Sequence, residues 1–378
     1  MSAPTELPIW ADAPTDPVPG LPGNIHPIAE PSDAVKHQGW VGERPPLNVF
    51  NWWMNLVYQW ASWLWGNVGI TLGRSACNPL TALCLGIPHR NVCARNISIG
   101  IPTYKAVLAL DFLWVVASNA NTLIKINPAT NAVIASWSGF NFPSAIVFDG
   151  TYIWVIESDI MGTPAGNLKK INPATGAVIL SISVGGTPDG GCFDGTNIWT
   201  GDASGTTIKK INVTTGAVGS PISGFSGPTD FAFDGTYVWV CNVETNTVSK
   251  VDPVAGTIVA TVTVGSTPQW MAFDGNYIWV SNYSGSVSKI DPIADTVVST
   301  VSFEVGDYVA GLAFDGRFIW LALGGTGKVA RIDPLANAVT HTITLDAATP
   351  QPHGLTFDGY HIWVSQVGSN YMQKIPVI

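Results

Sequence analysis

The chain has 378 residues, 11% of them charged, and a formal net charge of -9. This low charge content, together with 39 Gly, 27 Pro and 16 Trp, excludes a disordered chain, a coiled coil or a helical bundle as the main body. Because no run of Lys or Arg offers a phosphate-binding surface, no nucleic-acid partner is expected.

Residues 1–46 are rich in Pro and Gly and predict an extended arm that lies on a partner surface. The first twenty residues lack the positive and apolar regions of a secretory signal, which predicts synthesis and retention in a cytoplasm.

Residues 47–66 predict an α-helix that Asn48 caps and that is apolar on every face. Such a helix must be buried, so copies of this chain or a docking protein are implied. The stretch 45–73 has no charged residue and is long enough to cross a bilayer. Its Asn, Gln and Ser residues, and the lack of Lys or Arg anchors at its ends, argue against membrane insertion.

The segment GWVGERPPLNVFNWWMNLVYQW resembles a segment near the N-terminus of many bacteriophage tail fibre and tail-associated proteins. The resemblance implies virion-proximal attachment through residues 1–66 to other tail or baseplate proteins, assembly as a homo-oligomer with a trimer favoured, and location in the virion tail. The residues implied in attachment or oligomerisation are Trp40, Gly42, Glu43, Pro45, Pro46, Phe50, Asn51, Trp52, Trp53 and Trp60. The alternative is a Trp-rich helix that packs on the flank of the same chain.

Residues 67–95 match no motif and are interpreted as a linker. They contain three of the five Cys residues, but the chain has neither a CxxC motif nor a Cys/His zinc spacing. We therefore expect idle thiols, no metal and no cofactor.

From residue 96 onward the sequence is a repeat. The motif Phe-Asp-Gly precedes a Trp in six units, and Trp114 supplies a seventh with a shortened turn. These Trp residues recur every 40 to 45 positions, at Trp114, Trp154, Trp199, Trp239, Trp279, Trp320 and Trp363. A Lys-Ile-Asp-Pro-like marker keeps the same spacing, at Lys125, Lys170, Lys210, Lys250, Lys289, Arg331 and Lys374.

Each unit alternates with period two and is rich in Val, Ile and Thr, which predicts four antiparallel strands. Asp-Gly predicts a tight hairpin whose two turn residues both have positive φ. Asp/Asn-Pro-x-x-Gly predicts the next reversal, with Gly in the left-handed conformation. Four strands per unit of this length predict a mainly β fold, a seven-bladed β-propeller over residues 96–378.

The last unit is expected to lack an outer strand, because the chain ends at Lys374-Ile375-Pro376-Val377-Ile378, directly after the third strand of that unit. Residues 96–102 match the outer-strand consensus, so they are expected to complete that blade and cover its edge. The repeat residues resemble the YVTN-type family of seven-bladed propellers over residues 96–378. This resemblance implies the fold and little about function.

The Asp-Gly and Pro-x-x-Gly turns share one end of the ring, here called the repeated face. The other end, the variable face, carries loops that differ between units and is the expected binding face. Aromatic, amide and carboxylate side chains there suit a carbohydrate. The candidate ligand-binding residues are Asp189, Asp230, Gln269, Trp270, Tyr283, Asp307, Tyr308, His353 and Tyr371.

No catalytic residues are predicted. Glu157 and Asp159 lie on one loop with nothing to fix their separation. His341, His353 and His361 are the His residues of the ring, and they show no matched cluster of acids and metal ligands. A propeller lyase or hydrolase acting on a surface polymer therefore remains an alternative.

Together, the sequence predicts a phage tail fibre or baseplate-attached receptor-binding protein that contacts a host-surface glycan or protein. The second alternative is a virion decoration propeller without a ligand.

Overall fold

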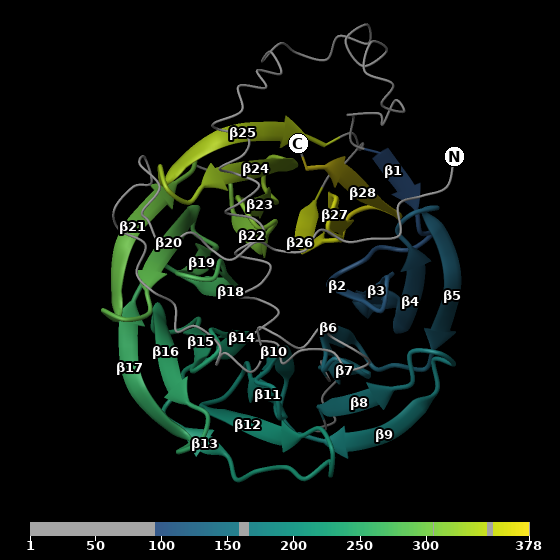
Figure 1. The fold of residues 1–378 in the computed structure, drawn as a ribbon, viewed down its shortest axis with the longest axis horizontal. Helices are drawn as coiled ribbons and strands as arrows, with labels where there is room; N and C mark the ends of the chain where they lie inside the picture. Colours follow the sequence, from purple (N-terminus) through teal and green to yellow (C-terminus); the bar gives the residue numbers. More distant parts are fainter. Residues whose placement is uncertain (1–94, 159–165, 305, 346–350, 378) are drawn as a thin grey trace, which may run out of the picture. The chain divides into compact units, whose positions relative to one another are not determined.

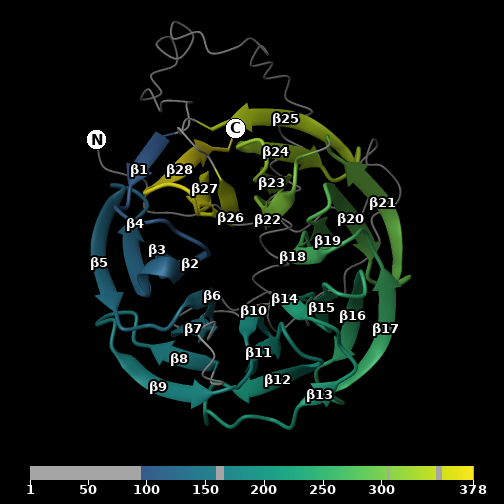
Figure 2. The same cartoon turned by 180° about the vertical axis from the view of Figure 1, so that it is seen from behind.

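The computed structural model describes residues 95–158, 166–304, 306–345 and 351–377. These residues form seven four-stranded antiparallel sheets, arranged as blades around a central axis (Figures 1 and 2). The predicted seven-bladed propeller is confirmed. The arm, the helix, the linker as far as residue 94 and all ten attachment residues lie outside the described residues. Within the described part, no helix has the length and apolar character needed to cross a membrane.

The blades are numbered 1 to 7 along the chain, and each contributes one strand to each of four layers around the axis. The innermost strands are β2 (Ala106–Ala109), β6 (Pro143–Phe148), β10 (Pro188–Phe193), β14 (Pro228–Phe233), β18 (Pro268–Phe273), β22 (Val309–Phe314) and β26 (Pro352–Phe357). The second strands are β3 (Phe112–Ala117), β7 (Ile153–Glu157), β11 (Asn197–Asp202), β15 (Val238–Asn242), β19 (Ile278–Asn282), β23 (Ile319–Leu323) and β27 (His361–Gln366). The third strands are β4 (Thr122–Asn127), β8 (Asn167–Ile171), β12 (Thr207–Asn212), β16 (Thr247–Asp252), β20 (Ser286–Asp291), β24 (Lys328–Asp333) and β28 (Tyr371–Pro376). The outermost strands are β5 (Ala132–Ser138), β9 (Val178–Ser183), β13 (Ile222–Ser223), β17 (Thr257–Thr263), β21 (Thr296–Ser302), β25 (Ala338–Thr344) and β1 (Arg95–Ser98). Within the described residues, one 3-10 turn, η1 (Ser118–Ala120), follows β3.

Blade 7 is completed by β1, which comes from the opposite end of the described chain. β1 pairs antiparallel with β28, and Ile97 is buried in one cluster with Met372 and Trp363. The predicted closing strand is therefore confirmed, although it spans Arg95–Ser98 and not 96–102. The pairing stops there because Ile99 and Gly100 both donate their N–H groups to one loop carbonyl, that of Asn370.

The Asp-Gly turns differ from the two-residue hairpin that the sequence predicts. In blade 4 the loop between β14 and β15 has four residues, 234–237, and within it Gly235 alone has a positive φ, of 97°. Blade 1 has the two-residue turn instead, formed by Leu110 and Asp111 with φ of 52° and 64°. The prediction was wrong because the Asp of each repeat is not a left-handed turn residue but a hydrogen-bond acceptor.

Asp234 shows what this Asp does. Its Oδ1 accepts hydrogen bonds from the N–H groups of Thr236 and Tyr237 at 2.8 and 2.7 Å, and its Oδ2 accepts one from Trp239 Nε1 at 2.7 Å. The Trp-to-Asp bond recurs at Asp149, Asp194, Asp274, Asp315 and Asp358. Blade 1 lacks this Asp, and Trp114 Nε1 is buried without a partner in the described residues.

The Lys of each marker joins neighbouring blades. Lys250 of blade 4 donates to the carbonyl oxygen of Pro292 at 2.6 Å and to Asp295 Oδ1 at 2.8 Å, both in blade 5. Equivalent bonds to the next blade come from Lys125, Lys170, Lys210, Lys289 and Lys374. Blade 6 has Arg331 at this position. The next blade, blade 7, has no turn between its third and fourth strands, because its fourth strand is β1 from the beginning of the described chain.

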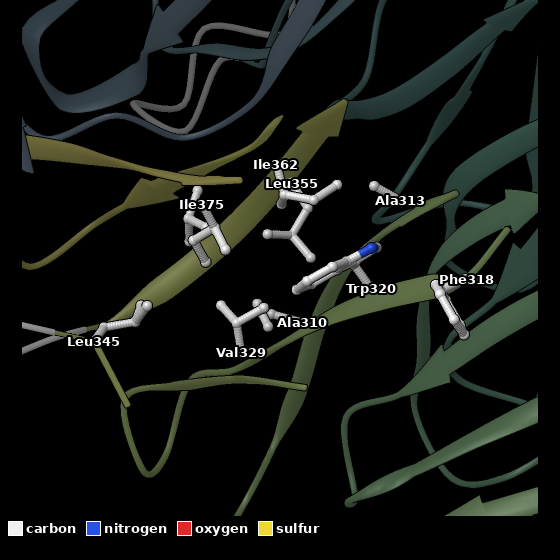
Figure 3. Packing of buried hydrophobic residues seen from close by; sticks show 11 residues of the cluster. Ala310, Ala313, Phe318, Trp320, Val329, Leu345, Leu355, Ile362 and Ile375 are labelled. Atoms are coloured by element: carbon white, nitrogen blue, oxygen red, sulfur yellow. The ribbon is translucent and has the colours of Figure 1, made fainter. Parts of the chain in front are cut away.

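The hydrophobic core lies between blades more than within them. Figure 3 shows Trp320 of β23 packed toward Leu355, Ile362 and Ile375, which belong to blade 7. All seven repeat Trp residues are at most 2% exposed. Burying such large side chains between neighbours supplies much of the apolar stabilisation of a ring.

The outermost strands carry no acidic or basic side chain except Arg95 in β1 and His341 in β25. Five of them instead have one extra residue, a β-bulge, at the same position, such as Ile134 between Val133 and Ala135. A bulge twists an edge strand and discourages pairing with another chain.

Candidate functional site

A cavity of about 180 Å³ lies in the central channel of the ring, since its walls come from six of the seven blades. Its lining residues are Lys105, Ala106, Ala145, Ile146, Gly191, Asp230, Phe231, Trp270, Gly354 and Leu355. The innermost strands that carry most of them surround the axis in Figure 1.

The strand register explains why these residues meet. In every blade the repeat Trp pairs with one residue of the innermost strand, for example Trp114 with Val107 and Trp239 with Ala232. Counting back two positions from that residue gives one equivalent position per blade: Lys105, Ala145, Gly190, Asp230, Trp270, Gly311 and Gly354. The preceding position is occupied by Tyr104, Ser144, Asp189, Thr229, Gln269, Ala310 and His353. Small residues in four blades leave room for the large or charged residues of the other three.

An ion pair crosses the channel. Lys105 Nζ of blade 1 lies 3.4 Å from Asp230 Oδ1 of blade 4, and both side chains are largely buried. The same Nζ lies 4.1 Å from the centroid of the Trp270 ring. The N–H of Met271 donates to Asp230 Oδ2 at 2.9 Å. This carboxylate is therefore held from two sides, and the ammonium group rests between an acid and an aromatic face.

Three aromatic rings from blades 1, 5 and 7 adjoin the ion pair. The ring centroids of Tyr104 and His353 are 4.2 Å apart, and those of Trp270 and His353 are 5.0 Å apart in an edge-to-face arrangement. Tyr104 and Trp270 are 6.3 Å apart. Such a group presents both ring faces and polar edges to a ligand.

Burial dominates the electrostatics of this group. It raises the pKa of Asp189 and of Asp230, while Lys105 opposes the rise in both cases. Burial, together with the nearby Lys105, lowers the pKa of His353 to about 3. The pKa of Tyr104 is raised by burial and by the two Asp residues. At neutral pH the His and Tyr rings are therefore uncharged.

Glycine is required where innermost strands approach each other most closely. A Cβ at Gly190 would collide with the carbonyl oxygen of Thr229, and one at Gly354 with that of Tyr104. Larger residues there would push the blades apart and displace Asp230 or Lys105.

The structure brings together four of the nine predicted ligand-binding residues: Asp189, Asp230, Trp270 and His353. It adds Tyr104 and Lys105, which the sequence analysis missed because blade 1 lacks the Asp-Gly turn that follows the other innermost strands and the Pro that begins five of them. Aligning Val107 with Ala232 through their Trp partners would have found both residues.

Of the other five predicted residues, four lie outside the innermost strands. Tyr283 and Tyr308 stack at 4.7 Å between ring centroids, in blade 5 and at the start of blade 6. Asp307, next to Tyr308, is buried, and its Oδ1 has no partner in the described residues. Gln269 precedes Trp270, and Tyr371 is 44% exposed at the start of β28.

Of the residues considered for catalysis, Glu157, His341 and His361 lie in three different blades of the described structure. Glu157 Oε1 forms an ion pair with Lys169 at 2.7 Å and accepts the N–H of Asn141. His341 lies in the outermost strand β25, and His361 pairs with Asp358 at the repeated face. Asp159 lies outside the described residues. Across residues 95–158, 166–304, 306–345 and 351–377, no group of three His, Cys, Asp or Glu side chains could hold a metal ion.

No protein-family model matches the sequence, and no curated protein sequence matches it either. Solved structures do match its fold. A streptogramin B lyase structure is 15% identical with a TM-score of 0.63, covering 75% of this chain and 96% of its own. A virginiamycin B lyase from Staphylococcus aureus is 15% identical with a TM-score of 0.64, covering 76% and 99%. The U3-55K structure is 10% identical with a TM-score of 0.66, covering 75% and 98%. At these identities the likeness establishes a β-propeller fold and no activity.

Proposed function

We propose that this protein is a structural component of a bacteriophage tail, a fibre or baseplate-attached protein, that binds a host-surface glycan or protein through its propeller. The observation that carries the binding role is the channel cluster, defined as Tyr104, Lys105, Asp189, Asp230, Trp270 and His353. Five blades contribute these residues at one level of the channel, where the fold itself needs no charge.

The chemistry of the channel cluster favours a polar ligand with apolar faces. An indole ring can stack on the C–H face of a sugar, and fixed carboxylates accept hydrogen bonds from hydroxyl groups. The cavity also has apolar walls at Ile146, Phe231 and Leu355. A carbohydrate residue combines both properties, which supports a glycan as the ligand.

The proposed attachment role rests on the sequence of residues 1–66. Their resemblance to tail-protein segments, with Trp-rich apolar character on all faces, supports anchoring to other tail or baseplate proteins and assembly as a homo-oligomer, a trimer in the favoured case. In the sequence this region leads through residues 67–94 to β1, the strand that closes blade 7.

Two variants of the full chain test this function in assembled particles. Trp270→Ala removes the largest ring of the cluster and should lower adsorption of particles to susceptible cells at least tenfold. Leu335→Ala, at a turn residue 93% exposed, is the matched control and should leave adsorption unchanged. Deletion of residues 1–66 should abolish incorporation into particles, and retained incorporation would refute the anchoring role.

Unchanged adsorption with Trp270→Ala would favour a decoration propeller over a receptor-binding protein. Release of soluble fragments from the host-surface polymer by the purified wild-type protein would favour a lyase or hydrolase instead. That activity would then have to disappear in His353→Gln, since His353 is the one ring His in the cluster.

A further inference from the structure

The loop that leads into blade 6 is longer than those that lead into blades 2 to 5. In those four blades, the loop between the preceding outermost strand and the innermost strand has four residues: 139–142, 184–187, 224–227 and 264–267. The loop that enters blade 6, residues 303–308, has six. Four residues suffice to join two blades elsewhere, so the added length on the variable face is a candidate for function.

Neighbouring loops hold this loop and an aromatic pair in place. The N–H of Phe303 donates to the carbonyl oxygen of Gly285 in blade 5 at 2.9 Å, and the N–H of Gly324 donates to that of Tyr308 at 3.0 Å. A Cβ at Gly324 would collide with the Tyr308 ring, and Tyr283 stacks on the same ring at 4.7 Å between centroids. Because Tyr283 is 42% exposed, the pair is fixed by its neighbours yet accessible.

A cavity of about 430 Å³ lies at the same loop, between blades 5 and 6. It is larger than the cavity of about 180 Å³ in the channel and has the size of a small-molecule site, roughly 300–1,000 Å³. Five polar side chains line it: Ser302, Glu304, Asp307, Lys328 and Thr342. None of these side chains forms a hydrogen bond or an ion pair with another described residue. The cavity thus presents donors and acceptors that the fold leaves unused.

Asp307 is the most deeply buried of these acidic and basic groups. The residue is 6% exposed, and its Oδ1 is buried without a hydrogen-bond partner in the described residues. A carboxylate oxygen that is removed from water and receives no donor destabilises the folded chain. Such groups are rare in native structures and mark places where function outweighs stability. Asp307 therefore needs a donor that the described chain does not supply.

Comparison with other blades shows that Asp307 has no equivalent task in the fold. Three residues after the repeat Trp, blade 3 has Asp202, whose Oδ1 accepts the N–H of Thr187 in the entering loop at 3.0 Å. Glu157 supports the entering loop of blade 2 in the same way. Blade 6 has Leu323 at this position. Its acid lies in the loop itself, as Asp307, and does not support the loop.

The unused groups of the cavity select a ligand chemistry. Carboxylates such as Glu304 and Asp307 only accept hydrogen bonds, and the ammonium group of Lys328 only donates them. A hydroxyl group does both, so a polyhydroxylated ligand satisfies the whole set. Tyr283 offers a ring face to the C–H face of a sugar. Two carboxylates against one ammonium group disfavour an acidic sugar.

From these observations we infer that blades 5 and 6 form a second ligand site, the junction site (Tyr283, Glu304, Asp307 and Lys328), which binds a neutral saccharide. Adjacent hydroxyl groups donate to Glu304 and Asp307, Lys328 donates to a sugar oxygen, and a C–H face packs on Tyr283. The junction site shares no residue with the channel cluster. That the saccharide belongs to a host surface rests on the proposed function, whereas the site itself does not.

Binding of the labelled full chain to a printed array of bacterial surface oligosaccharides, both neutral and acidic, tests the inference. The wild type should bind neutral glycans. Asp307→Asn keeps the shape of the side chain and should raise the half-saturating concentration at least about tenfold, because hydrogen bonds to charged groups contribute this much. Tyr283→Ala should act in the same direction. The controls Asp111→Asn and Tyr360→Ala, at exposed turn residues of the repeated face, should bind like wild type. Binding to acidic glycans alone, or to no glycan, would overturn the inference.

Thermal unfolding without glycan provides a second readout. If Asp307 served the fold, Asp307→Asn would lower the midpoint of unfolding. Because its Oδ1 has no partner in the described residues, the midpoint should stay unchanged or rise. A folded Asp307→Asn protein that binds neutral glycans like wild type would refute the junction site. If Asp307→Asn does not fold, Tyr283→Ala decides, since unchanged binding in that variant would also refute the site.

The two proposals fail separately. If Trp270→Ala abolishes glycan binding while Asp307→Asn leaves it unchanged, the channel cluster is the glycan site and the junction site is refuted. If Asp307→Asn lowers glycan binding while Trp270→Ala leaves particle adsorption unchanged, the junction site stands and the role of the channel cluster is refuted. If no glycan binds but Trp270→Ala lowers adsorption, the receptor role stands and the junction site is refuted.

Discussion

The hydrogen bond between each repeat Asp and its Trp should be a principal determinant of ring stability, and Asp234→Asn tests it. Asn keeps the shape of the side chain, and its amide oxygen can still accept the two backbone N–H groups of the turn. The amide NH₂ then faces Trp239 Nε1, where Asp234 Oδ2 accepts at 2.7 Å. Two donors oppose each other, and Trp239 is 0% exposed, so no water replaces the lost acceptor.

The cost combines a lost bond to a charged acceptor, about 1.5–3 kcal/mol, with an unsatisfied buried donor, about 1–3 kcal/mol. Since these contributions overlap, we expect the free energy of unfolding to fall by about 3 kcal/mol. For a ring of this size the midpoint should fall by about 2 °C per kcal/mol, or about 6 °C in total. Urea unfolding followed by circular dichroism, together with calorimetry, measures both quantities.

Blade 1 provides the matched control. Asp111 lies in a two-residue turn with φ of 64°, a conformation that Asn also tolerates, and it does not bond to Trp114, whose Nε1 has no partner in the described residues. Asp111→Asn should change stability by less than about 0.5 kcal/mol. A loss below about 1 kcal/mol in Asp234→Asn, or an equal loss in both variants, would refute this account of the Asp-Gly turn.

Three further predictions concern blade contacts, closure and pH. Lys250→Met keeps the apolar stem of the side chain but removes the hydrogen bonds to Pro292 and Asp295. The free energy of unfolding, measured with urea, should fall by about 2 kcal/mol. The control Lys328→Met removes no such bond between blades and should lower it by less than about 0.5 kcal/mol. Ile97→Asp places a charge in the buried cluster that joins β1 to β28. It should destabilise the ring by about 3 kcal/mol or more and expose blade 7 to proteolysis. The control Ser98→Asp, at an exposed position of β1, should be tolerated. The pKa of His353 is lowered to about 3 in the folded protein, against about 6.5 in the unfolded chain. As the pH falls from about 6.5 to about 3, the unfolded chain binds the proton first. The free energy of unfolding therefore falls in this range, by at most about 1.4 kcal/mol per pH unit. Asp189 and Asp230, whose pKa values are raised, act in the opposite direction, so the measurement is the difference between wild type and His353→Gln at pH 7 and pH 4.5. Equal acid sensitivity of the two proteins would contradict the buried, neutral His353.

The sequence predicted the closed ring because its information is local and repeated. A Trp spaced every 40 to 45 residues, alternating strands and a Pro-containing reversal determine each blade without reference to the others. Even the missing outer strand of the last blade could be predicted, since NISIGIP matches the consensus that the other blades use. The turn type was predicted wrongly, because Asp-Gly alone does not reveal that the Asp carboxylate bonds to a Trp five residues later.

Part of the candidate site could be predicted as well. Asp189, Asp230, Trp270 and His353 were predicted as aromatic and carboxylate side chains on the variable face, where they suit a carbohydrate. Their grouping could not be predicted, because it depends on how seven strands surround one axis and not on distance along the chain.

Closure of the ring determined which side chains meet in the central channel. Lys105 and Asp230 are separated by 125 positions in the chain, and only the circular arrangement of blades 1 and 4 brings their side chains across the channel. Tyr283 and Tyr308 instead stack on each other outside the innermost strands, although sequence analysis grouped all of these residues on one face. Local periodicity thus determined the blades of this protein, while the tertiary structure alone determined which side chains share the low-dielectric space at its centre, where burial alters their proton affinities.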